Sequence, residues 1–163
     1  MNVAVVKKMF GGALAIMICG LVALSVAQEK PADNMQMLRD KIQADKKLLV
    51  ATNMELTESE AQRFWPLYDQ YQKDLHKINQ RLANMLESYA ADFQRKSLTD
   101  EKAKKLIAEA VAIEQAEAQL KSTYAPQLGK VLPVKKVARY LQIENKIRAI
   151  VKYDIASGMP LVQ

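Results

Sequence analysis

The stretch LTESEAQRFWPLYDQYQKDLHKINQRLANMLESY, residues 56–89, decides the fold. Thr57 and Glu60 match a capping box, in which each side chain binds the other residue's backbone N–H, and Leu56 supplies the apolar residue that precedes such a box. Apolar residues then recur at alternating steps of four and three: Phe64, Tyr68, Tyr71, Leu75, Ile78, Leu82, Met85 and Tyr89. This spacing predicts one long helix over residues 57–95, with a packing face along its whole length.

Pro66 lies inside this predicted helix, beside aromatic residues. Because proline has no N–H for the carbonyl of Gln62 and its ring crowds that carbonyl, we expect a kink here. We expect Trp65 and Tyr68 to belong to an aromatic core at one end of a helix bundle. The alternative is that part of this cluster stays exposed and binds client polypeptides.

A second helix start follows in KSLTDEKAKKLIAEA, residues 96–110. Thr99 is the expected N-cap, Leu98 precedes it, and acidic residues stand in the first turn, where the helix dipole favours negative charge. Apolar residues at helical spacing predict a helix over residues 99–131, with a second kink at Pro126. The short connection predicts that the two long helices form an antiparallel hairpin.

Shorter helices are expected on either side of this hairpin. Asp33 is the expected N-cap of a helix over residues 34–52. The apolar residues on one of its faces are Met35, Leu38, Ile42 and Leu49. Pro133 can open a last helix over residues 133–156. Its expected buried face comprises Tyr140, Ile143, Ile147 and Ile150. The sequence therefore predicts one all-α domain of four helices in residues 28–163.

Gly158 and Pro160 mark the expected end of the last helix. Glycine readily takes the left-handed conformation that stops a helix, and a proline just beyond it prevents continuation. We expect the apolar Leu161 and Val162 that follow to dock on the body of the domain.

Charged residues are expected to lie on solvated faces. Acidic and basic residues four apart would pair along single helices, each pair adding only about 0.2–0.5 kcal/mol. These pairs are Asp69 with Lys73, Glu101 with Lys105, Glu117 with Lys121, and Glu144 with Arg148. Lys135, Lys136 and Arg139 form a basic cluster, and such a cluster is usually a solvated face as well. The alternative is an electrostatic rim that attracts acidic or partly unfolded polypeptides.

Residues 1–27 have the pattern of a secretory signal peptide. Lys7 and Lys8 precede a long uncharged run with a small-x-small ending, so cleavage is expected after Ala27. The alternative is an uncleaved anchor, because this run is just long enough to span a bilayer. Cleavage would leave an exported chain with no transmembrane segment.

Removal of the signal peptide would change the composition. The one cysteine, Cys19, would leave with it, so the exported chain is expected to have no disulfide and no thiolate chemistry. The formal net charge would fall from +6 to +4, because the 24 basic residues lose Lys7 and Lys8 and leave 22 against 18 acidic residues. Nucleic acid is then a poor partner, whereas anionic lipid headgroups or unfolded acidic polypeptides are reasonable ones.

No catalytic, cofactor or metal site is recognisable in the sequence. His76 is the only histidine, and its neighbours one helical turn away, Gln72, Lys73, Asn79 and Gln80, include no carboxylate and no second imidazole. We expect an exposed helix histidine, with a weak intermolecular metal site as the alternative. The chain also lacks a phosphate-binding glycine loop and a nucleophile elbow. We therefore expect a protein that is not an enzyme and that needs no cofactor.

The two helix starts resemble a known motif. LTESE, residues 56–60, and LTDEK, residues 98–102, are similar to the Leu-Thr-x-x-Gln motif of the periplasmic Spy/CpxP-like family, with Glu60 and Lys102 at the place of the glutamine. The resemblance spans residues 33–155 and is typical of a separate proteobacterial branch of that family. It implies a periplasmic protein with a long, kinked helical hairpin that pairs into an antiparallel homodimer, whose concave side faces clients or sensor partners.

The resemblance and the helical pattern together predict the function. We expect an ATP-independent periplasmic chaperone or envelope-stress protein that binds unfolded or partner polypeptides. Long amphipathic helices in a thin layer cannot bury all their apolar faces, which leaves contact surface for a client. The alternative is a regulatory adaptor, or a metal-responsive accessory protein of a membrane sensor.

Cleavage of the signal peptide can be measured directly. N-terminal sequencing or intact mass of the exported protein is expected to show Gln28 as the first residue. A mature protein that retains Lys7 and Lys8 would contradict the predicted cleavage and favour the anchor.

Overall fold

The computed structural model describes residues 45–162, and every regular element in this part of the chain is a helix. The helices are residues 45–54, α3 at Glu58–Arg95, α4 at Asp100–Gly129 and α5 at Val134–Gly158. The predicted all-α fold is confirmed for the described residues. The predicted signal peptide, its cleavage site after Ala27, and the predicted helix start at Asp33 lie outside them.

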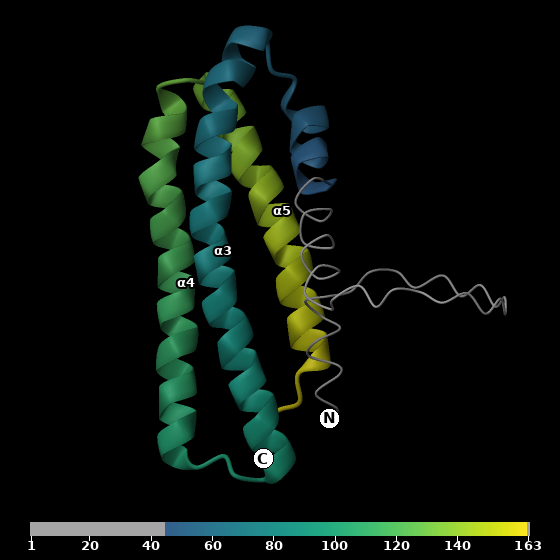
Figure 1. The fold of residues 1–163 in the computed structure, drawn as a ribbon, viewed down its shortest axis with the longest axis vertical. Coiled ribbons are helices and arrows are strands. Elements are labelled where there is room, and N and C mark those ends of the chain that lie inside the picture. The colour runs from purple at the N-terminus through teal and green to yellow at the C-terminus, as the bar shows by residue number, and fades with distance from the viewer. Residues whose placement is uncertain (1–44, 163) are drawn as a thin grey trace, which may run out of the picture.

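α3 and α4 lie side by side and run in opposite directions, joined by a short turn at residues 96–99 (Figure 1). α5 starts at the end of the molecule where α4 ends and runs back along the other two helices. It has 25 residues against 38 in α3, and it stops before it reaches the turn between α3 and α4 (Figure 1). Helix 45–54 lies beside the first half of α5.

Both prolines of the hairpin lie inside helices. Pro66 is in α3 and Pro126 in α4. The kinks expected at these two residues stay predictions. None of the helices between residues 45 and 162 combines the length and the apolar character that crossing a bilayer requires.

α3 begins with the capping box that the sequence predicts. The Glu60 N–H donates to the Thr57 hydroxyl at 3.3 Å, and the Thr57 N–H donates to the Glu60 carboxylate at 2.8 Å. Two backbone donors at the helix start are thereby satisfied. The same carboxylate accepts from the Lys136 ammonium of α5 at 2.6 Å, and this hydrogen bond lowers the pKa of Glu60. The capping box is therefore also a contact between α3 and α5.

The turn between α3 and α4 is built differently. Lys96 ends α3 in the left-handed conformation, with φ 51°, and the Ser97 N–H donates to the Asp92 carbonyl at 2.9 Å. At the start of α4, the Lys102 N–H donates to the Thr99 hydroxyl at 3.4 Å, which is a long hydrogen bond. A lysine side chain cannot accept the second hydrogen bond of a capping box. The Lys102 ammonium donates instead to the Asp92 carboxylate at 2.6 Å.

The inward faces of the helices meet in an apolar core with aromatic rings at its centre. The ring centroid of Tyr71 in α3 lies 5.3 Å from that of Tyr124 in α4 and 5.7 Å from that of Tyr140 in α5, both in edge-to-face geometry. Phe64 makes a similar contact with Tyr140 at 5.2 Å. The other buried apolar side chains are Val50, Met54, Tyr68, Ile78, Leu82, Leu86, Tyr89, Ala90, Ile113, Leu120, Leu128, Leu132 and Val137. The seven-residue repeat of α3 thus marks its packing face.

One residue of the predicted buried face of α5 is exposed. α5 turns Tyr140 and Glu144 toward the core. Ile143 and Ile147 are half-buried, and Ile150 is 63% exposed. The prediction for Ile150 was wrong because Glu144 occupies the middle of the buried face, so that the isoleucines lie to one side of it.

The predictions for the C-terminal tail were also wrong. Gly158 does not have a positive φ; it is the last residue of α5, and the chain leaves the helix in an extended conformation. Leu161 and Val162 are 88% and 62% exposed rather than docked. The tail is held one residue earlier, where the carbonyl of Pro160 accepts from the Tyr89 hydroxyl at 2.8 Å.

The two helix caps should differ in strength. Thr57→Ala is expected to lower the free energy of unfolding by about 1 kcal/mol, because the Glu60 N–H at the start of α3 loses the hydroxyl that accepts its hydrogen bond. Thr57→Ser keeps the hydroxyl and should cost little. Thr99→Ala should cost less than Thr57→Ala, since its hydrogen bond is longer and is not reciprocated. Urea unfolding followed by circular dichroism measures all three variants. An equal or larger loss in Thr99→Ala would contradict this difference.

Candidate functional site

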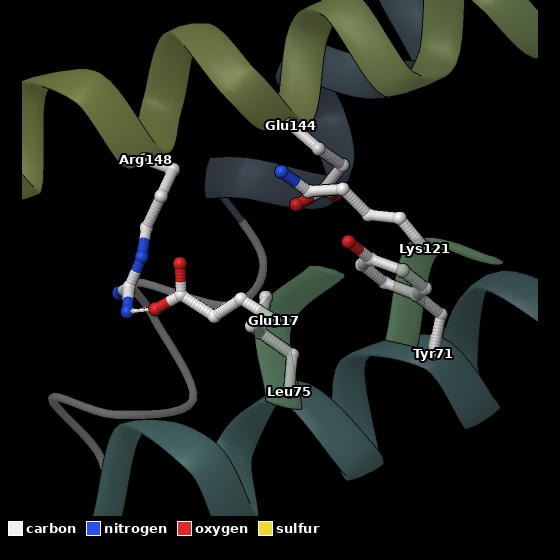
Figure 2. Close-up of a pocket in the computed structure, with 6 residues that line it drawn as sticks. All are labelled: Tyr71, Leu75, Glu117, Lys121, Glu144 and Arg148. Atoms are coloured by element: carbon white, nitrogen blue, oxygen red, sulfur yellow. Dashed lines mark ion pairs between the residues drawn. The ribbon is translucent and has the colours of Figure 1, made fainter. Parts of the chain in front are cut away.

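Charged side chains are buried between α4, α5 and helix 45–54. We call Lys46, Glu117, Glu144 and Arg148 the central charged cluster. Glu144 is 3% exposed and Glu117 is 7% exposed. The Lys46 ammonium lies 2.8 Å from a carboxylate oxygen of Glu144, and Arg148 of α5 reaches across to pair with Glu117 of α4 (Figure 2). Each buried carboxylate is thus held by a cation from a different helix.

Two amide side chains of α3 join this cluster. The amide oxygen of Gln72 accepts from the Lys46 ammonium at 2.7 Å, and its NH₂ group donates to Glu144 at 2.8 Å. Asn79, seven residues further along α3, accepts from Arg148 at 2.9 Å. Residues seven apart lie on the same face of a helix. The central charged cluster therefore connects α3, α4, α5 and helix 45–54.

A cavity of about 20 Å³ lies against the cluster (Figure 2). It is lined by Tyr71, Leu75, Glu117, Lys121, Glu144 and Arg148. This volume accommodates one water molecule and is too small for an organic substrate.

Burial lowers the pKa of the Arg148 guanidinium and raises the pKa of the Tyr71 hydroxyl. In residues 45–162 there is no group of three histidine, cysteine, aspartate or glutamate side chains placed to hold a metal ion. The central charged cluster therefore connects the helices of the bundle and has no space for a substrate.

None of the four predicted pairs along single helices forms in residues 45–162. Asp69 pairs with Lys47 and Glu101 with Lys104. Glu117 and Glu144 are buried and pair between helices, whereas Lys121 donates to Asn145 at 2.6 Å. A buried carboxylate keeps its charge only when a cation or hydrogen-bond donors surround it, and here those partners come from distant parts of the chain. One signal was present in the sequence, because Glu117 occurs where the apolar stripe of α4 requires a buried residue.

The predicted aromatic residues lie at the junction of α3 and helix 45–54. Tyr68 is 3% exposed and Trp65 is half-buried, with their ring centroids 5.3 Å apart. The Lys47 ammonium lies 5.1 Å and 5.6 Å from the ring centroids of Trp65 and Tyr68, within range of a cation–π interaction. The Tyr68 ring belongs to the core. Of these two predicted client-binding residues, only Trp65 is accessible to a client.

The predicted basic cluster does not form a continuous free rim. Lys136 is half-buried and donates to the Glu60 carboxylate at 2.6 Å and to the Glu55 carbonyl at 2.7 Å. Arg139 lies 3.3 Å from the Glu55 carboxylate. Lys135 is exposed. Two of the three cations thus fasten the start of α5 to the segment that leads into α3.

The end of the hairpin near the turn between α3 and α4 is not covered by α5 (Figure 1). In this part of α4, Ile107 is 65% exposed and Val111 is 49% exposed. We call these two residues the apolar strip; because they are four apart, they share one face of the helix. Glu114, one turn further on, lies 3.6 Å from Lys152 near the end of α5. The apolar strip therefore begins where the cover provided by α5 ends.

A groove of about 390 Å³ lies between α3 and α4 at the same end. Its lining residues are Arg81, Asn84, Met85, Ser88, Asp92, Lys102, Lys105, Leu106 and Glu109. Arg81 holds Glu109 with two hydrogen bonds of 2.9 and 3.0 Å, and this contact lowers the pKa of the Glu109 carboxyl. The groove thus combines an apolar lining with charges of both signs. Neither the groove nor the apolar strip is among the sites predicted from the sequence.

Comparison with family models, with curated proteins and with solved structures finds no match for this chain. The likeness to the Spy/CpxP-like family rests on the two short helix starts at residues 56–60 and 98–102, and it stays a prediction. What the protein does is therefore inferred from its own surfaces.

The central charged cluster should show strong coupling between its members. Glu117→Leu leaves Arg148 buried without its carboxylate and is expected to cost about 3–5 kcal/mol of unfolding free energy. The double variant Glu117→Leu/Arg148→Met replaces both charges by apolar groups and should cost less than Glu117→Leu alone. Urea unfolding of the two single variants and the double variant measures the coupling. Losses that simply add would contradict a buried, mutually dependent pair.

Proposed function

We propose that this chain is a periplasmic protein that binds unfolded or partner polypeptides without ATP and without catalysing a reaction. The observation that carries this proposal is the apolar strip, Ile107 and Val111, at the end of the hairpin that α5 leaves uncovered. Exposed apolar side chains next to charges of both signs are typical of surfaces that hold other polypeptides. The resemblance of the helix starts to the Spy/CpxP-like family supports the same function.

The apolar strip suits weak and reversible binding. Complete burial of a valine or isoleucine side chain is worth roughly 1.5–3 kcal/mol, and both residues of the strip are already partly covered. The parts still exposed can supply roughly 2–3 kcal/mol before the cost of association is subtracted, so one strip alone binds with a dissociation constant above about 1 mM. A client held this weakly dissociates spontaneously, so release requires no ATP.

The assembly that we propose follows the resemblance. The hairpin is kinked at Pro66 and Pro126 and pairs with a second copy into an antiparallel homodimer. A homodimer presents two apolar strips to one client, and linked weak contacts bind far more tightly than a single one. The dimer would therefore raise the affinity for long unfolded chains without making any one contact slow to release.

Aggregation of an unfolding client tests this function. We expect the unmodified protein to suppress the light scattering of a reduced, aggregating secreted protein. In Ile107→Asp/Val111→Asp, two carboxylates replace the apolar contacts and would have to lose water on binding, so about tenfold more protein should be needed for equal suppression.

The matched control places the same charges elsewhere on α4. Gln119→Asp/Thr123→Asp adds two carboxylates, also four residues apart, at exposed positions at least two helical turns beyond Val111. This variant should suppress aggregation as well as the unmodified protein does. Lack of suppression by the unmodified protein at several-fold excess, or equal activity of the strip variant, would overturn the proposed function.

A further inference from the structure

The groove near the turn between α3 and α4 is separate from the apolar strip. Lys105 lines the groove, whereas Ile107 belongs to the strip. Residues two apart on a helix point about 160° away from each other, so these two side chains lie on opposite flanks of α4. A ligand in the groove therefore does not compete with a client on the apolar strip.

Two ion pairs that cross from α3 to α4 mark the ends of the groove. Arg81 holds Glu109 with two hydrogen bonds, and the Lys102 ammonium donates to the Asp92 carboxylate at 2.6 Å. This hydrogen bond lowers the pKa of Asp92. The two pairs are eleven residues apart along α3 (92 minus 81) and seven along α4 (109 minus 102), or about 16 Å and about 10 Å of helix. An occupant that lies between them is therefore short.

The residues between the two ion pairs combine an apolar floor with polar walls. Met85 and Leu106 are half-buried, whereas Asn84, Ser88 and Lys105 are exposed. A methionine side chain is flexible and adapts to apolar partners of different shape. Because the walls are exposed, the groove is open along its length and a chain segment can enter from the side.

Lys105 gives the groove an excess of positive charge. Glu101, one turn earlier, pairs with Lys104 at 2.9 Å, and the two ion pairs across the groove do not include Lys105. Among residues 45–162, Lys105 has no ion-pair partner. The lining thus has three cations and two carboxylates, which favours a ligand with one negative charge.

The polar wall on α3 matches the repeat of an extended polypeptide. Asn84 and Ser88 are four residues apart, which is about 6 Å along the helix axis. Peptide groups on one side of an extended chain recur every two residues, or about every 6.6–6.8 Å. These two side chains can therefore bond successive peptide groups of one segment. An acyl chain would offer them neither a donor nor an acceptor.

We propose that the groove binds an extended polypeptide segment that carries one carboxylate side chain beside an aliphatic one. At about 3.3 Å per residue, the space between the ion pairs accommodates about three to five residues. The carboxylate pairs with Lys105, the aliphatic side chain covers Met85 and Leu106, and Asn84 and Ser88 hydrogen-bond the backbone. This site goes beyond the proposed function, because it selects a sequence and does not depend on the apolar strip.

A peptide titration followed by the amide resonances of the protein tests the site. The probe is Gly-Ser-Leu-Glu-Leu-Ser-Gly with blocked ends, so that the glutamate is its one charge, and the comparison peptide has glutamine in its place. Amides in residues 81–92 and 102–109 are expected to shift, with the glutamate peptide bound about threefold more tightly. Equal affinities of the two peptides, or shifts confined to other residues, would overturn the proposal.

Two matched pairs of variants assign the binding to the groove. Lys105→Glu should weaken binding of the glutamate peptide about tenfold, because an attraction becomes a repulsion, whereas Lys73→Glu makes the same change of charge at an exposed residue outside the groove and should have little effect. Ser88→Phe should fill the groove and abolish binding. Gln94→Phe, on the opposite side of α3, should not. Equal effects within either pair would contradict a site in the groove.

Three further results separate this site from other occupants and from the apolar strip. Decanoate, a carboxylate on an acyl chain, should bind more weakly than the glutamate peptide; tighter binding would identify a lipid anion as the occupant instead. Ser88→Phe should leave the mass in sedimentation equilibrium unchanged, since a loss of dimer would identify a second copy of the chain. Ile107→Asp/Val111→Asp should bind the peptide normally, and a loss of binding there would refute a separate site.

Discussion

The length of α5 relative to the hairpin is the constraint on which the rest of the structure depends. α3 has 38 residues and α5 has 25, which correspond to about 57 Å and about 38 Å of helix. A helix that stops short cannot cover the hairpin over its full length, so near their turn α3 and α4 have mainly each other to pack against. This is the part of α4 in which Ile107 and Val111 remain exposed.

Buried charges fix the point at which α5 ends. Sliding α5 by one turn would separate Glu144 from Lys46 and Arg148 from Glu117, and an unpaired buried charge costs several kcal/mol. Apolar side chains alone would tolerate such a shift better, because burial has no direction. The central charged cluster therefore defines the register of the bundle, and that register leaves the turn end of the hairpin open.

Features that depend on residues close together could be predicted from the sequence, and features that depend on distant ones could not. The capping box at Thr57 and the packing face of α3 depend only on residues within one or two helical turns of each other. Their spacing in the sequence was therefore enough to predict both. Glu144 and Arg148 also fit a pair along one helix, and spacing alone could not reveal that each prefers a partner on another helix. Ile107 and Val111 widen the apolar face of α4, but their exposure follows from where α5 ends, which local spacing does not determine.

Photo-crosslinking from single positions is the most direct test of the claim that clients bind at the open end of the hairpin. A photoreactive amino acid at Val111 is expected to capture an unfolding client efficiently. The same group at Val134 serves as the control, because Val134 is 79% exposed but lies at the start of α5 and outside the apolar strip. Strong capture at Val111 with little at Val134 is the predicted result. Equal capture at both positions would show that clients do not select the uncovered end.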